Sequence, residues 1–162
     1  KSGSLWLLVT ATASHLPSLG KSSSRIMTLA DAFLMFLLRN GIPVAALDVD
    51  QVAWPLQVRP AQGSEHYVGL GGEAESPETD EVSFIDAQGR AHARRWTHRQ
   101  SGLSAVRDGT STVLIVMEAV HAGARRDVDA LAWALAQAIA ESWHTTAERA
   151  PLSSSSAVFV FG

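Results

Sequence analysis

Residues 94–100, Arg-Arg-Trp-Thr-His-Arg-Gln, form the group of side chains in this sequence that is best equipped for chemistry. If the segment is a strand, its side chains alternate between two faces. One face then carries an aromatic ring, an imidazole and hydrogen-bond donors, from Arg94, Trp96, His98 and Gln100. Such a face suits an amino-acid ring, or a nucleobase with its ribose phosphate. The alternative is an edge strand with solvated arginines and a tryptophan at the core margin, and the residue types favour neither.

Other chemistry is poorly supported by the sequence. There is no cysteine, and the histidines lack the spacing of a zinc hydrolase. The Gly-Lys-Ser run at Gly20 lacks the earlier glycine of a phosphate loop, since His15 stands there. No serine lies in a G-x-S-x-G turn. We therefore expect no metal and no cofactor.

The bulk composition sets limits on the class of protein. A chain of 162 residues with 46% hydrophobic content predicts a single domain over residues 1–162. The net charge of −3 disfavours a broad nucleic-acid surface, so no DNA is expected. The apolar run Leu5–Val9 is too short to cross a membrane. The absence of cysteine fits a cytoplasmic protein.

The order of the predicted elements indicates an α+β fold. An apolar strand over 5–13 precedes a long helix over 26–40, and a second long helix is expected to be capped by Asp127. Between them lie short strand-like segments, which predict a mainly antiparallel central sheet: 56–61, 66–72, 81–90, 91–99 and 111–120. Gln88-Gly89 predicts a hairpin turn. A last strand is expected within 153–161, and its Val-Phe-Val-Phe run could complete a sheet in a second copy, so a homodimer is one open arrangement.

An acidic stretch, 71–81, is joined by the predicted hairpin to the basic stretch 90–99. Surface pairing between the two would contribute little stability for each pair.

Four stretches resemble a known family in order and spacing. They are 26–52, which contains Gly-Ile-Pro-Val-Ala-Ala-Leu-Asp-Val-Asp, and then 56–73, 81–102 and 109–120. Together they resemble the B3/B4 domain, the editing domain of the bacterial phenylalanyl-tRNA synthetase β subunit, which also occurs as small free-standing proteins. The resemblance is strongest over 26–120 and implies an α+β fold with a pocket for the aminoacyl end of tRNA.

The resemblance also implies a function. The chain is expected to hydrolyse, in trans, the ester of a mischarged or non-standard aminoacyl-tRNA, which it meets at the acceptor end. The alternative is a non-catalytic module that binds aminoacyl-tRNA, an amino acid or a nucleotide-like ligand, in a specialised pathway for instance. Two family positions differ here, because Ala45 replaces a histidine and Leu34 an asparagine. The amino-acid specificity of the synthetase is therefore not assumed.

The expected roles of the residues follow from the segment 94–100 and from the resemblance. His98 is expected to orient or deprotonate the water, and Arg94, Trp96 and Gln100 to form one pocket wall. Matching family positions add three substrate-binding residues, with Glu118 expected to hold the ammonium group of the substrate: Glu118, Arg59 and Asp48. Arg95 and Arg99 are expected to meet phosphates of the tRNA.

Overall fold

The computed structural model describes residues 5–12, 41–107, 109–143, 145–153 and 156–160. The chain divides into two compact units. The first comprises Lys1–Val44 with Arg107–Gly162, and the second comprises Ala45–Val106. Each unit is described separately below.

The first unit is built around a sheet with the strand order β10-β1-β9-β2. Strand β1 (Leu5–Thr12) pairs antiparallel with β9 (Thr112–Ala119) on one side and with β10 (Ala147–Leu152) on the other. Strand β2 spans Val44–Asp48, and its residues from Ala45 onward belong to the second unit. All residues of β9 except the first are buried, which explains why this segment is an almost continuous apolar run.

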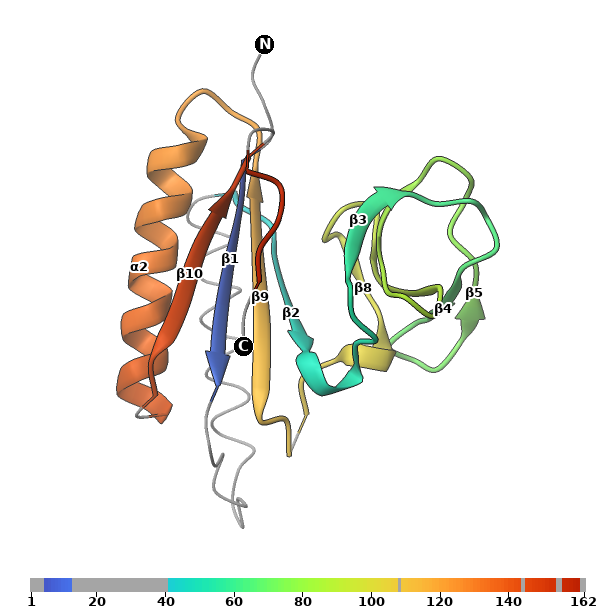
Figure 1. Ribbon diagram of the computed structural model, residues 1–162, viewed down its shortest axis with the longest axis horizontal. Helices are drawn as coiled ribbons and strands as arrows, with labels where there is room; N and C mark the ends of the chain where they lie inside the picture. The colour runs from blue at the N-terminus through green and yellow to red at the C-terminus, as the bar shows by residue number, and fades with distance from the viewer. Residues whose placement is uncertain (1–4, 13–40, 108, 144, 154–155, 161–162) are drawn as a thin grey trace. The chain divides into compact units, whose positions relative to one another are not determined.

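Helix α2 (Ala124–Trp143) contacts β1, β9 and β10, and Figure 1 shows it lying along the sheet. Its buried side chains recur at helical spacing: Val128, Leu131, Leu135 and Ile139. The helix begins at Ala124, so Asp127 lies in its first turn and not at the cap as expected. An acidic side chain there is still favourable, because the first turn carries the positive end of the helix dipole.

The second unit holds a six-stranded sheet in the order β3-β6-β7-β4-β5, with β8 paired to β7. In Figure 1 its strands curve strongly. The strands are β3 (Gln57–Pro60), β4 (His66–Val68), β5 (Ala74–Glu75), β6 (Val82–Ile85), β7 (Arg90–Arg94) and β8 (Arg99–Gln100). Two short 3-10 helices, η1 (Val49–Gln51) and η2 (Gly102–Ser104), complete it. Tyr67, Ile85 and Ala91 belong to its buried core.

The α+β class is confirmed, with two corrections to its details. Strands β4 and β7 pair in parallel, so the sheet is mixed and not purely antiparallel. The chain leaves β4 through β5, crosses to β6 and returns in β7, which therefore runs in the same direction as β4. One α-helix lies among the described residues, and the other expected helix, over 26–40, falls outside them.

Two local predictions have opposite outcomes. The turn at Gln88-Gly89 is confirmed: Gly89 has a φ of 74°, and its N–H donates to the carbonyl of Asp86. The expected strand within 153–161 is wrong for the described part, because the last strand is β10 and residues 157–160 form none. Pairing in a homodimer stays a prediction. None of the described helices combines the length and the apolar character needed to cross a membrane.

Candidate functional site

The segment 94–100 is a hairpin turn and not one strand. Strand β7 ends at Arg94, β8 begins at Arg99, and these two residues pair across the hairpin. Arg95 and Trp96 both adopt left-handed backbone conformations, with φ of 50° and 64°, and the N–H of His98 donates to the carbonyl of Arg95 at 3.3 Å. The expected alternation of side chains across 94–100 is therefore wrong, because the chain reverses within it.

Arg94 is buried and fully engaged by carboxylates of its own unit. It is 2% exposed, and it donates from Nε and Nη2 to Glu81 at 2.8 and 3.0 Å and from Nη1 to Glu75 at 2.5 Å. Arg99 donates two further hydrogen bonds to Glu75, each of 2.9 Å. Both guanidinium groups lie over the ring of Tyr67, at 5.0 and 5.4 Å. We call these five residues the Arg94 cluster.

The charged side chains of the Arg94 cluster are held in their ionised forms. Hydrogen bonds from Arg94 lower the pKa of Glu81, and those from Arg99 and then Arg94 lower the pKa of Glu75. The acidic and basic stretches of the sequence thus do pair, but through a buried arginine and not only at the surface. Because Arg94 and Arg99 already bind carboxylates, the cluster stabilises the hairpin before any ligand arrives.

A β-bulge explains how Arg94 reaches Tyr67. Ile85 pairs with Ala91 and Phe84 with Ala93, so β7 contains one extra residue, His92. The extra residue allows Ala91 and Arg94, three positions apart, both to contact Tyr67.

His92 and Asp86 form a buried pair that the sequence analysis missed. His92 is fully buried, and its Nε2 lies 3.0 Å from Oδ2 of Asp86. Burial lowers the pKa of His92 in spite of the carboxylate, so the ring is neutral and donates from Nε2. Its Nδ1 has no hydrogen-bond partner among the described residues. The local signal was the hairpin sequence Asp-Ala-Gln-Gly-Arg-Ala-His, which brings both residues to one turn.

Asp86 organises the turn before β7. It accepts hydrogen bonds from the backbone N–H groups of Ala53, Gln88 and Arg90, and from Nε of Arg90 at 2.8 Å. Burial by itself would raise the pKa of Asp86, but the hydrogen bonds from His92 and Arg90 outweigh it and lower the pKa far below its usual range. Asp86 is therefore a structural carboxylate.

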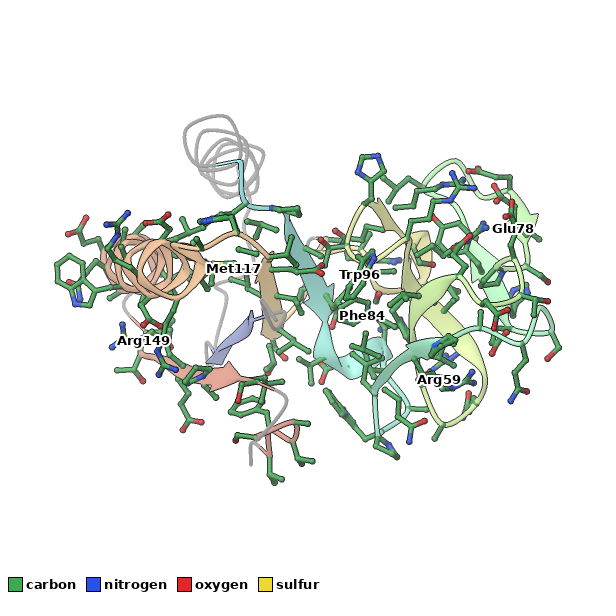
Figure 2. The ribbon with its side chains drawn as sticks, turned by 90° about the horizontal axis from the view of Figure 1, so that it is seen from above. Arg59, Glu78, Phe84, Trp96, Met117 and Arg149 are labelled. Carbon is green, nitrogen blue, oxygen red and sulfur yellow. The ribbon has the colours of Figure 1, made fainter. Side chains whose placement is uncertain are left out.

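The other side chains of the segment 94–100 differ from Arg94 in exposure and in their partners. Trp96 is 39% exposed and is labelled in Figure 2, and His98 is exposed. Gln100 donates from its amide to the carbonyl of Ala46. The side chain of Arg95 is 53% exposed and makes only long contacts, of 3.6 Å to Glu78 and 3.5 Å to Glu81. Arg95 is thus the arginine of the segment 94–100 that remains available to a phosphate.

Arg59 and Asp48 also have structural partners. Arg59 donates from Nη1 to Glu65 at 2.8 Å, and Glu65 accepts further hydrogen bonds from the backbone of Gln62 and Gly63. Asp48 is buried, and its side chain accepts from the N–H of Asp50 at 3.1 Å and caps η1. Their substrate-binding roles stay predictions.

Glu118, on the central strand β9 of the first unit, has a different environment. It is 7% exposed, and its carboxyl group has no hydrogen bond or ion pair among the described residues. Burial raises its pKa to about 7. In Figure 2, Met117 lies between β9 and α2, and alternation along the strand places Glu118 on the opposite face. It is the one acid in the apolar sequence of β9, a signal that is visible without the structure.

The described residues contain no group of three or more His, Asp or Glu side chains arranged to hold a metal ion. The functional candidates are therefore the lone carboxyl group of Glu118 and the exposed side chains of the hairpin turn at 95–98.

Two compact units, one with a helix packed on a sheet and one made of curved strands, define an α+β domain with a lone buried acid on a central strand. The family model described as the B3/4 domain matches residues 16–131, so the chain belongs to this family, as the sequence indicated. The match runs across both units.

A solved structure supports the fold assignment. The chain is similar to an N-terminal fragment of the phenylalanyl-tRNA synthetase β subunit from Pyrococcus horikoshii, with a TM-score of 0.60 and 14% identity. The similarity covers 89% of this chain but 46% of that fragment, so the chain spans less than half of its length. The comparison with curated proteins found no match.

Proposed function

We propose that this chain acts on aminoacyl-tRNA and hydrolyses, in trans, the ester that joins a wrong or non-standard amino acid to the terminal adenosine. The observation that carries the proposal is Glu118, a buried carboxyl group without a described partner on the central strand of a B3/4 domain. The fold shared with a fragment of a phenylalanyl-tRNA synthetase β subunit supports the choice of substrate.

The chemistry is within reach of such a site. An aminoacyl ester is already activated, so hydrolysis needs mainly a positioned water and donors for the carbonyl oxygen. The chain has no cysteine, and the reaction needs none. We assign to Glu118 a contact with the aminoacyl group. The role of His98 in activating water stays a prediction from the sequence, since the exposed His98 lies in the other unit.

The contact with tRNA is proposed to be small. Arg94 and Arg99 are occupied by Glu75 and Glu81, which leaves Arg95 as the candidate for a phosphate on the hairpin. A single phosphate contact to a single strand predicts a shallow salt dependence, with a slope of log K against log salt of about −0.7. This fits a contact limited to the acceptor end.

The test is the lifetime of the ester on a panel of correctly and wrongly charged tRNAs, with the purified full chain. We expect faster hydrolysis of at least one mischarged species, reduced tenfold or more in Glu118→Gln. The matched control is Glu148→Gln, because Glu148 is an exposed glutamate on β10 of the same unit. The variant His98→Ala tests water activation separately. Unchanged ester lifetimes across the panel would refute hydrolysis.

Binding without hydrolysis is the alternative outcome of the same assay. Protection of the ester, together with saturable binding of the charged tRNA, would show a carrier or sensor in place of a hydrolase.

A further inference from the structure

The hairpin turn at 95–98 has a backbone that its own side chains disfavour. Arg95 and Trp96 are consecutive residues in left-handed conformations, with φ of 50° and 64°. In this conformation the Cβ of an L-residue crowds the following carbonyl, so glycine or asparagine is the usual occupant. Thr97 adds a second cost, because it is buried and its hydroxyl has no hydrogen-bond partner among the described residues. Stability alone therefore does not explain this turn.

The surrounding fold holds the turn in this conformation. Arg94 and Arg99 pair across the hairpin directly below the turn, and both donate to Glu75. The N–H of Trp96 also donates to the carbonyl of Val82 at 3.0 Å. The Arg94 cluster thus fixes both ends of the turn. Backbone strain that the rest of a structure maintains in this way is typical of functional sites.

The turn displays an aromatic ring beside a cation. Trp96 is 39% exposed, although tryptophan is one of the more buried residue types, and the side chain of Arg95 is 53% exposed. An accessible indole next to a guanidinium is the combination on which the bases of single-stranded nucleic acids stack. Because both residues belong to a fixed turn, binding a base requires little further ordering of the protein.

The neighbouring charges favour a base over a run of phosphates. Glu78 lies 3.6 Å from Arg95 and its side chain is 78% exposed, and Glu81 lies 3.5 Å from the same guanidinium. These carboxylates would repel a series of phosphates, so the turn is suited to one phosphate at most. A nucleobase is uncharged and can stack on an indole ring without this repulsion.

We propose that Trp96 is the stacking platform for the terminal nucleobase of a tRNA acceptor end, held in place by the Arg94 cluster. The inference rests on the proposed function, which supplies the single-stranded end as the ligand. It deepens that function by assigning recognition of the nucleoside to the hairpin turn of the second unit. Binding at the turn is then independent of the attached amino acid, and an uncharged end binds as well.

The experiment measures binding to RNA that carries no amino acid. The full chain, which has five tryptophans, is labelled with nitrogen-15 and its indole N–H signals are followed by NMR. It is titrated with the RNA tetranucleotide ACCA up to about 1 mM, and separately with the same RNA lacking the terminal base. We expect ACCA to shift the signal of Trp96, assigned from its loss in Trp96→Tyr. Removing the terminal base should weaken binding about fivefold or more.

Three variants with a matched control test the role of the ring. Trp96→Leu should weaken binding of ACCA by about the same factor and remove the preference for the terminal base, whereas Trp96→Tyr should keep part of that preference. Trp133→Leu is the control, because Trp133 is 58% exposed on α2 of the other unit, and it should leave binding unchanged. Arg95→Asn should weaken binding but raise the melting temperature, because asparagine tolerates a left-handed backbone.

Several outcomes would overturn the inference even if the chain hydrolyses esters. They are an unshifted Trp96 signal up to about 1 mM RNA, equal binding of the RNA that lacks the terminal base, and full affinity in Trp96→Leu. A lower melting temperature in Arg95→Asn would count against it too, because stability would then explain the turn. Conversely, unchanged ester lifetimes with a shifted Trp96 signal and a preference for the terminal base would refute hydrolysis and support this inference.

Discussion

Buried acids have opposite pKa shifts in the two units of this chain. In the second unit, Asp86, Glu65 and Glu81 accept hydrogen bonds from arginine side chains or backbone N–H groups, and each has a lowered pKa. In the first unit, Glu118 lies in an apolar strand, and burial raises its pKa to about 7. The carboxyl groups are chemically alike, so the difference comes from the donors around them. Carboxylates that accept several hydrogen bonds stabilise the fold of the second unit, whereas Glu118 accepts none from the side chains and backbone that the structure describes.

The largest expected effect comes from removing the central cation of the second unit. Arg94→Met removes the ion pairs of Glu81 and Glu75 with Arg94, which leaves Glu81 with only the long contact to Arg95 and Glu75 with Arg99. We expect a loss of about 3–5 kcal/mol in the free energy of unfolding, measured by urea denaturation. Arg95→Met is the control, because Arg95 is exposed and makes only long contacts. A loss below about 1 kcal/mol would contradict a structural role for the Arg94 cluster.

Next in size is a matched pair of carboxyl-to-amide changes. Asp86→Asn should destabilise the protein at pH 8 by about 2–4 kcal/mol, because an amide cannot accept all the hydrogen bonds that Asp86 accepts. Glu118→Gln should instead stabilise it by about 1–3 kcal/mol at the same pH, because the cost of a buried charge is removed. Both changes are followed by chemical denaturation.

The effect of Glu118→Gln has a defined pH window. The pKa of Glu118 is raised in the folded state, so its proton contributes stability below the unfolded value of about 4.3, and that stability is lost as the pH rises through about 7. The variant and the wild type should therefore converge near pH 4. A variant that is less stable than the wild type at pH 8 would show that the carboxylate has a partner.

The smallest expected effect concerns His92, whose pKa is lowered by burial. The unfolded chain binds a proton near pH 6.5 and the folded chain at a lower pH, so stability falls as the pH drops below 6.5, by up to about 1.4 kcal/mol per pH unit. Glu118 changes stability in the opposite direction over pH 4.5–7, which flattens the profile of the wild type. Denaturation between pH 7 and pH 5 should therefore show the acid sensitivity most clearly in Glu118→Gln. If the free energy of unfolding of this variant did not change between pH 7 and pH 5, protonation of His92 would not destabilise the folded protein.

Much of the fold was predictable because it depends on local patterns. The apolar run of β9, the helical spacing in α2 and the Gln88-Gly89 turn all carry signals that act over a few residues. The reversal at Arg95-Trp96 was missed, because hairpin turns with positive φ favour glycine and asparagine, and an Arg-Trp pair gives no such signal. The parallel pairing of β4 with β7 depends on the order of strands in space and was equally hidden.

The candidate site was only partly predictable for the same reason. Arg94 is bound to Glu75 and Glu81, which precede it by 19 and 13 residues, so its burial follows from tertiary pairing that residue types do not reveal. The family resemblance pointed to Glu118, whereas its raised pKa depends on its burial, which only coordinates can show. The pairing of His92 with Asp86 required both the hairpin and the bulge.

The bulge at His92 also bears on how this chain could vary in length. Deleting a residue from a buried strand usually reverses the inward and outward positions of everything beyond it. Here the flanking pairs, Ile85 with Ala91 and Phe84 with Ala93, would become consecutive rungs of a regular ladder if His92 were removed, and Arg94 would keep its place opposite Ser83. A chain without His92 would thus keep the same pairing of β6 with β7, with one residue fewer in β7.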